Sequence, residues 1–237
     1  MSGFELRKSG IKELLLDIVF PNKCPLCSEA VYWKNYCCDK CFDKGLWIRY
    51  DKGDICRCCG HYVCRCYNIE RVYDSCYSAG FYSESVREAV LALKYECSTN
   101  AAEIFAEMIY RQMLHDGNTD YEFIVPVPMN ERKQKKRGYN QAEILAERLS
   151  ARLGTEIRND LLIHSYSRSS QHDRTAEERA EFAEKEYYTA DNIHINGGKI
   201  LLCDDVLTTG STINRCAYLL KEAGAGLVTA AVCAVTL

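Results

Sequence analysis

The sequence of 237 residues lacks a hydrophobic run long enough to cross a membrane. Its longest uncharged apolar stretch, residues 223–237, falls short of the roughly 20 residues of a membrane helix, and its Val, Ala and Thr content suits a buried strand. The first 20 residues carry Lys12, Glu13 and Asp17 within their apolar part, so they lack the continuous core of a secretion signal. These absences predict a cytoplasmic protein without membrane insertion.

An excess of positive charge is also missing. The formal net charge is −3 and the isoelectric point is near 6.0, which argues against a surface built as a whole for nucleic acid but leaves room for a local patch. We find no low-complexity tract and no internal repeat beyond paired cysteine motifs. With 47% hydrophobic residues the chain can bury one ordinary domain and a smaller one.

Cysteine, in contrast, is abundant, and ten of the fifteen cysteines precede residue 67. Without an export signal, metal ligation explains this cluster better than a disulfide scaffold. Two residues between cysteines let both sulfurs face one ion, and four thiolates close a tetrahedral structural zinc site. The spacing C-x2-C-x10-C-x2-C and a second, shorter group of similar form therefore predict two structural zinc ions, held by Cys24, Cys27, Cys38 and Cys41 and by Cys56, Cys59, Cys64 and Cys66.

Several alternatives stay open for this cluster. Cys37 and Cys58 are left over, Cys58 or His61 could replace a ligand of the second site, and the paired motifs could also combine in a crossed order. The cysteines could instead be buried thiols without metal. All-sulfur ligation leaves no position for a substrate, so the zinc would be structural. Residues 1–70 hold 11 Lys and Arg against 9 Asp and Glu, and two loaded sites would bring their charge to about −2, which weakens a phosphate-tracking role.

Apolar periodicity divides the chain at about residue 70. Residues 4–20 predict an amphipathic helix that ends before Pro21, and residues 21–70 are Cys-rich and lack long periodic runs. From residue 71 onward, strand and helix patterns alternate, which predicts a parallel sheet covered on both faces. We expect strands at 73–82, 121–128, 161–164, 199–206 and the carboxyl end, and helices over about 85–93, 101–114, 141–153 and 211–223.

The stretch KILLCDDVLTTGST at residues 199–212 carries the clearest chemical pattern. Small hydroxyl residues and loop amides before a helix amino terminus can enclose a phosphate monoester. The two adjacent acids at the end of the strand can accept hydrogen bonds from vicinal hydroxyls. A sugar phosphate satisfies both, whereas the alternative is an ordinary strand–turn–helix connection with a well-capped helix.

This stretch resembles the 5-phosphoribosyl-1-pyrophosphate (PRPP) signature of type I phosphoribosyltransferases. FPNKCPLC, VPVPMNERKQKKRGYNQAEILA, Ser170-Gln171 and Glu178-Arg179 precede it in the order seen in the ComF competence family, so the resemblance spans almost the whole chain. It implies an α/β type I phosphoribosyltransferase fold, a Rossmann-like parallel sheet flanked by helices, with a small amino-terminal zinc-ribbon domain. The expected domains are residues 1–70, with the helix and double zinc ribbon, and residues 71–237.

The resemblance also implies roles for individual residues. The ribose hydroxyls would be held by Asp204 and Asp205, and the 5′-phosphate by Thr208, Thr209, Gly210, Ser211 and Thr212. The basic stretch, which could otherwise be a solvated loop, would bind pyrophosphate through Arg132, Lys136 and Arg137. The polar stretch 165–196 would form a closing flap that contains Gln171 and Arg179, and Mg²⁺ would accompany PRPP.

By resemblance, the function is that of a magnesium-dependent, PRPP-binding protein of the ComF family, linked to DNA uptake and recombination. As an enzyme it would be a glycosyltransferase that moves the phosphoribosyl group to an unidentified acceptor. The alternative is a non-catalytic PRPP sensor whose zinc ribbon binds single-stranded DNA or a helicase-like partner of the DNA-uptake machinery.

Overall fold

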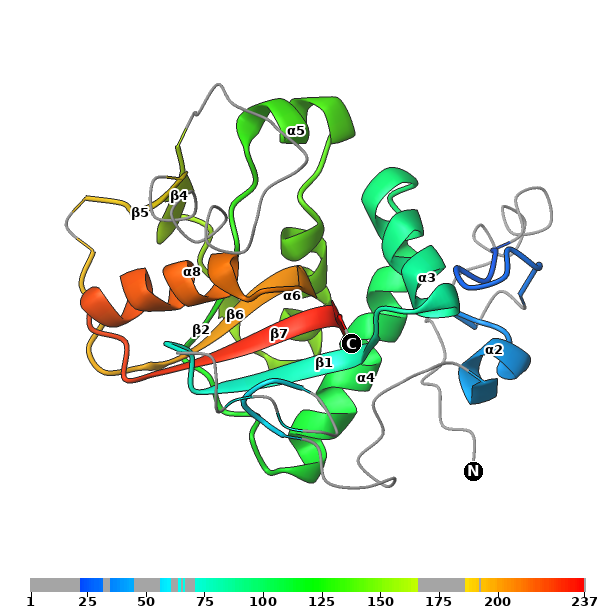
Figure 1. The fold of residues 1–237 in the computed structure, drawn as a ribbon, viewed down its shortest axis with the longest axis horizontal. Helices are drawn as coiled ribbons and strands as arrows, with labels where there is room; N and C mark the ends of the chain where they lie inside the picture. The colour runs from blue at the N-terminus through cyan, green and yellow to red at the C-terminus, as the bar shows by residue number, and fades with distance from the viewer. Residues whose placement is uncertain are drawn as a thin grey trace.

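The computed structural model describes residues 22–31, 35–44, 56–60, 64, 66, 71–165, 186–191 and 193–236. Their main element is a parallel sheet of five strands in the order β1–β7–β6–β2–β3 (Figure 1). The strands comprise Ser75–Phe81 (β1), Phe123–Pro126 (β2), Glu156–Ile157 (β3), Lys199–Leu207 (β6) and Leu227–Val235 (β7). This sheet and its flanking helices confirm the predicted α/β class.

Helices cover both faces of the sheet, as the strand sequences require. Along β6, Ile200 and Leu202 point into the core beneath α8, whereas Leu201 and Cys203 point into the core beneath α4 and α6. This period of two on a strand buried on both faces explains its nearly continuous apolar run. The larger helices comprise Glu84–Tyr95 (α3), Thr99–His115 (α4), Gln141–Leu153 (α6) and Ser211–Glu222 (α8).

Smaller elements surround this layered body. Leu162–His164 (β4) and Tyr187–Thr189 (β5) pair antiparallel as a separate two-stranded sheet above α8 (Figure 1). Glu131–Arg137 (α5) is a short helix between β2 and α6, and none of its residues is buried. Asp39–Lys44 (α2) carries two of the predicted zinc ligands.

The cysteine segments dock on this body at two separate places, at opposite ends of α4. Near its amino end, Asn100 Nδ2 donates to the carbonyl oxygen of Lys23 over 3.3 Å. Near its carboxyl end, the Arg57 guanidinium donates to Gln112 Oε1 over 3.0 Å and pairs with Asp116 over 2.7 Å. The described parts of residues 22–66 therefore contact the sheet body directly. A domain boundary at residue 70 stays a prediction.

The second cysteine segment covers the free edge of β1. The backbone N–H of Cys76 donates to the carbonyl oxygen of Arg57, as a neighbouring strand would. Gly60 adopts φ +73°, and a Cβ atom there would lie 3.2 Å from Cγ1 of Val235 at the end of β7. Glycine is thus required at Gly60 both for its backbone conformation and for this close approach.

The predicted elements mostly match these bounds. The helix expected at 141–153 ends as predicted at Gly154, which adopts the left-handed conformation with φ 70°. Periodicity did not predict α5, β3 or β5. The helix expected at 4–20 lies outside the described residues. In the part of the chain that the structure describes, no helix combines the length and apolar content needed to span a membrane.

Candidate functional site

The candidate site lies between two neighbouring strands whose following helices cover opposite faces of the sheet. β2 and β6 are neighbours, but β2 leads through α5 into α6 on one face, whereas β6 leads into α8 on the other. Open parallel sheets bind ligands at such a switch point, beyond the carboxyl ends of the strands. A cavity of about 260 Å³ opens there, lined by residues from β6, α3, α5, α6, β4, β5, the start of α8 and the segment after β2.

Asp204 and Asp205, the predicted acidic pair, line this cavity at the end of β6. The backbone N–H of Asp205 donates to Asp204 Oδ1 over 2.8 Å. Burial, with the neighbouring Asp205 charge as the second cause, raises the pKa of Asp204 to about 8. One of the two carboxyl groups is thus held protonated near neutral pH, and a ligand that presents hydroxyls or a cation would favour its ionised form.

Lys94 from α3 provides the counter-charge, which sequence reasoning missed. Its Nζ lies 2.9 Å from Asp205 Oδ2, with about a fifth of each side chain exposed. A signal was available, because Lys94 follows Val86 and Val90 at helical spacing and so lies on the apolar face of its helix. A lysine on a buried face needs a carboxylate partner, which in turn predicts an acidic site nearby.

The predicted phosphate loop turns directly from β6 into α8. Gly210 caps the helix with φ 81°, and Thr209 Oγ1 and Ser211 Oγ are 2.9 Å apart. Thr212 in the first turn lines the cavity, whereas Thr208 is exposed. The first turn of α8 contains no acidic residue, so the positive end of the helix dipole remains available to an anion.

The basic stretch divides between two sides of α5. Lys133 and Arg137, one helical turn apart, line the cavity. Arg132 and Lys136, which the family resemblance assigned to pyrophosphate, are also one turn apart but do not line it. The cavity lining therefore includes Arg137 from the predicted set and also Lys133, which was not predicted, and the pyrophosphate role of Arg132 and Lys136 stays a prediction.

The segment that follows, residues 137–141, fixes the helices around the cavity. Gly138 ends α5 in the left-handed conformation, and the Tyr139 hydroxyl accepts a 2.8 Å hydrogen bond from the backbone N–H of Cys97 after α3. Asn140 caps α6 and donates to the carbonyl oxygen of Val127 over 3.0 Å. These contacts explain the structural role of the RGYNQ segment, which holds α3, α5, α6 and the end of β2 together.

The opposite wall comes from the small sheet. His164 and Tyr187 line the cavity, with their rings edge to face and their centroids 4.9 Å apart. His164 Nδ1 lies 2.7 Å from the carbonyl oxygen of Ser165. We had expected a strand around His164 but assigned it no role in the site, and nothing in the surrounding polar stretch marked Tyr187. The flap residues Gln171 and Arg179 lie outside the described residues.

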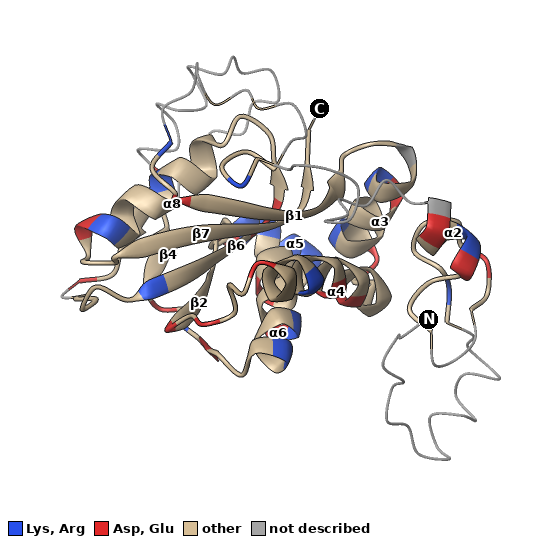
Figure 2. Cartoon of the chain, turned by 90° about the horizontal axis from the view of Figure 1, so that it is seen from below, with Lys and Arg blue, Asp and Glu red and all other residues tan. Residues whose placement is uncertain are grey.

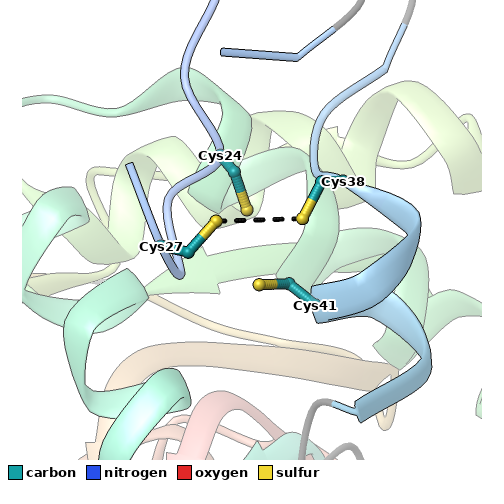
Figure 3. A group of neighbouring side chains, drawn as sticks. All are labelled: Cys24, Cys27, Cys38 and Cys41. Carbon is teal, nitrogen blue, oxygen red and sulfur yellow. Dashed lines mark hydrogen bonds between the residues drawn. The ribbon is translucent and has the colours of Figure 1, made fainter. Parts of the chain in front are cut away.

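The cysteines form the two groups that their spacing predicts, in the uncrossed order, and Figure 3 shows the first of them. Within each group of four, all sulfur atoms lie within 4.8 Å of one another. A tetrahedral zinc ion with bonds of about 2.3 Å requires sulfur separations of about 3.8 Å. Cys27 and Cys38 are 3.8 Å apart, and Cys56 and Cys66 are 3.5 Å apart, so both donor sets could hold zinc.

The leftover cysteines lie outside both donor sets. Cys37 is buried and donates to the carbonyl oxygen of Cys38 over 3.2 Å, and Cys58 is exposed. A hydrogen bond from Cys37, opposed by burial and aided by backbone N–H groups, lowers the pKa of Cys24 to about 4. A thiol that ionises so readily suits a metal ligand. His61 is not among the described residues.

Comparison with known proteins supports the same interpretation. The phosphoribosyl transferase domain matches residues 135–235, which include the acidic pair, the phosphate loop and Arg137. DNA utilization protein YhgH of Escherichia coli is 24% identical over 210 residues, 86% of each chain. Competence protein F of Haemophilus influenzae is 27% identical over 67% of this chain and 72% of its own.

Two further matches are shorter. Competence protein ComFC of Streptococcus pneumoniae is 31% identical over 144 residues, 61% of this chain and 60% of its own. A solved structure of the allosteric regulatory enzyme of purine biosynthesis matches 52% of this chain and 24% of its own, at 15% identity and a TM-score of 0.34, too low to carry an argument. The curated relatives and the domain match together support a ComF family assignment, and the matched phosphoribosyl transferase domain contributes residues to the cavity.

Proposed function

We propose that the cavity binds PRPP together with Mg²⁺ and that the protein is a phosphoribosyltransferase. One observation carries the proposal: an acidic pair, Thr212 at the start of the helix that follows the hydroxyl-rich loop, and two cations of α5 line one cavity at the β2–β6 switch point. PRPP has a counterpart for each of these groups, namely ribose hydroxyls, a 5′-phosphate and a pyrophosphate.

Each group has a distinct task in this proposal. Asp204 and Asp205 accept hydrogen bonds from the ribose hydroxyls and stabilise positive charge on the sugar as its bond to pyrophosphate loosens. The loop 208–212 holds the 5′-phosphate, while Lys133 and Arg137 stabilise the departing pyrophosphate. Mg²⁺, for which the carboxylate oxygens are suitable ligands, would neutralise charge on the pyrophosphate. A nitrogen atom of the acceptor then forms the new bond to the sugar carbon.

Calorimetry with PRPP and Mg²⁺ tests the binding step. We expect the wild-type protein to bind and Asp204→Asn/Asp205→Asn to lose at least tenfold in affinity. Asp120→Asn is a matched control, because Asp120 is exposed and precedes β2 at the other end of the strands. Equal affinity of the double variant and the wild type would refute the site.

A turnover assay separates an enzyme from a sensor. Pyrophosphate release from PRPP in the presence of a panel of nucleobases and related amines would support the transferase. PRPP binding without release for any acceptor would favour the sensor. The flap residues Gln171 and Arg179 would then be tested by alanine substitution, with loss of turnover and retained binding as the expected result.

A second role, in handling single-stranded DNA, is favoured by the relatives, which are named for DNA utilization and competence. The contact could be made with DNA itself or with a helicase-like protein. Binding of a labelled oligonucleotide to the zinc-loaded protein tests the first option. Failure to bind at low salt would argue for a protein partner, since electrostatic attraction to phosphates is strongest there.

A further inference from the structure

We infer that α5 and Tyr95 together form a binding surface for single-stranded nucleic acid at the mouth of the cavity. This inference rests on the DNA-handling role proposed above and does not require that the cavity bind PRPP. It assigns the contact to α5 and Tyr95, whereas the family resemblance implied the zinc ribbon.

The first observation is the charge of α5. Its seven residues, ERKQKKR, include five cations and one acid, and none of them is buried. Lys135 is 81% exposed, and its contact with Glu131 is a loose 3.6 Å ion pair on the helix surface. Since the whole chain has a net charge of −3, this +4 helix is a local positive patch (Figure 2). Such a patch attracts a phosphate backbone.

The second observation is an exposed aromatic ring beside this helix. Tyr95 is 68% exposed, the highest value among the large hydrophobic residues that the structure describes. The Arg137 guanidinium of α5 lies over the ring, 5.2 Å from its centroid. Arg137 also donates to Gln141 Oε1 over 2.9 Å, which holds the guanidinium in place.

A cationic helix beside an exposed ring favours one class of ligand. Proteins bind single strands by combining a positive track for the backbone with aromatic side chains on which bases stack. In a duplex the base faces are already stacked on one another, so Tyr95 would gain little from it. The zinc segment lacks both features in its described helix, because α2, DKCFDK, balances two lysines with two aspartates.

The position of the surface couples it to the cavity. Arg137 lines the cavity and also stacks on Tyr95, so a nucleic acid on this surface and an anion in the cavity compete for the same cation. If the anion lowers the affinity for the nucleic acid by some factor, the nucleic acid must lower the affinity for the anion by the same factor. The surface therefore makes nucleic-acid binding sensitive to whether the cavity is filled.

Fluorescence anisotropy with a labelled 20-nucleotide oligothymidine and the zinc-loaded full chain tests this inference. We expect Lys135→Glu to weaken binding about five- to tenfold and to reduce the salt slope by about 0.7 for each lost phosphate contact. Tyr95→Ala should weaken binding about fivefold or more with an unchanged slope, because stacking is not ionic. Lys40→Glu, the same charge reversal at an exposed position of α2, should change affinity by less than about twofold.

Three results would overturn the inference. They are a loss for Lys40→Glu as large as for Lys135→Glu, equal affinity for single strand and duplex, and no binding by the wild-type protein at about 50 mM salt. Circular dichroism and zinc content verify that each variant is folded. If calorimetry finds no PRPP binding while the oligonucleotide results hold, the proposal for the cavity fails and this surface survives.

Discussion

The Lys94 ammonium of α3 lies 2.9 Å from the Asp205 carboxylate at the end of β6, so a cation from one side of the cavity neutralises the acidic pair on its floor. Lys94→Met should raise the pKa of Asp204 further, because the lysine charge lowers it. We expect PRPP and Mg²⁺ to bind about tenfold more weakly at pH 7 and to recover at pH 9, as measured by calorimetry. Lys221→Met is the control, since its 2.9 Å pair with Asp74 lies elsewhere.

Asp204 should make the free protein less stable at higher pH. Its pKa is about 8 in the folded state and near 3.8 when unfolded, so the folded state binds the extra proton between these values. The contribution of Asp204 to stability therefore falls as pH rises from about 4 to 8. Asp204→Asn should raise the free energy of unfolding by on the order of 1 kcal/mol at pH 8 and by much less at pH 5. A gain that does not depend on pH would contradict the assigned protonation state.

The two sides of α5 should contribute differently to PRPP binding. Lys133→Ala/Arg137→Ala removes the two cations of α5 that line the cavity and should weaken binding at least tenfold, since a charge-assisted hydrogen bond contributes about 1.5–3 kcal/mol. Arg132→Ala/Lys136→Ala removes the same charge from the other side and should have an effect of less than threefold. If calorimetry shows a larger loss of PRPP affinity for Arg132→Ala/Lys136→Ala, the assignment made from the family resemblance is supported instead.

The protein should contain about two zinc ions per chain. Cys27→Ser and Cys64→Ser should each lower this number to about one, because three thiolates hold zinc less tightly than four. Cys37→Ser and Cys58→Ser should leave two ions, since neither sulfur belongs to a donor set. Elemental analysis after gel filtration provides the measurement, with Cys97→Ser as a control at an exposed cysteine. A folded protein without metal would refute both sites.

Arg57 should stabilise the whole protein, although it lies between ligands of the second zinc site. It pairs with Asp116 and bonds to Gln112, and it is 29% exposed. Arg57→Met should cost about 1–3 kcal/mol in the free energy of unfolding, because it leaves these partners unsatisfied. Arg87→Met removes a more exposed pair with Glu88 and should cost less than about 0.5 kcal/mol. Similar costs in denaturant unfolding would mean that Arg57 does not anchor the cysteine segment.

The sequence predicted the sheet, its main helices and the composition of the cavity floor, because each depends on local patterns. The apolar run that ends at Asp204 and the helix that ends at Gly154 are examples. Long-range contacts were not predictable in this way. Lys94 reaches Asp205 across 111 positions of the chain, and the choice between Lys133 and Lys136 depends on the rotation of a short exposed helix that periodicity did not predict.

The segment around Gly60 should protect the protein from self-association only while zinc is bound. It closes the outer side of β1, and it contains two thiolates of the second donor set. Without metal the segment would keep only contacts such as those of Arg57, and a strand with bare N–H and carbonyl groups would become more available to other chains. The other outer strand, β3, has only two residues and offers little template. Metal depletion should therefore make this protein self-associate through β1 before the cavity at the carboxyl ends of β2 and β6 is lost.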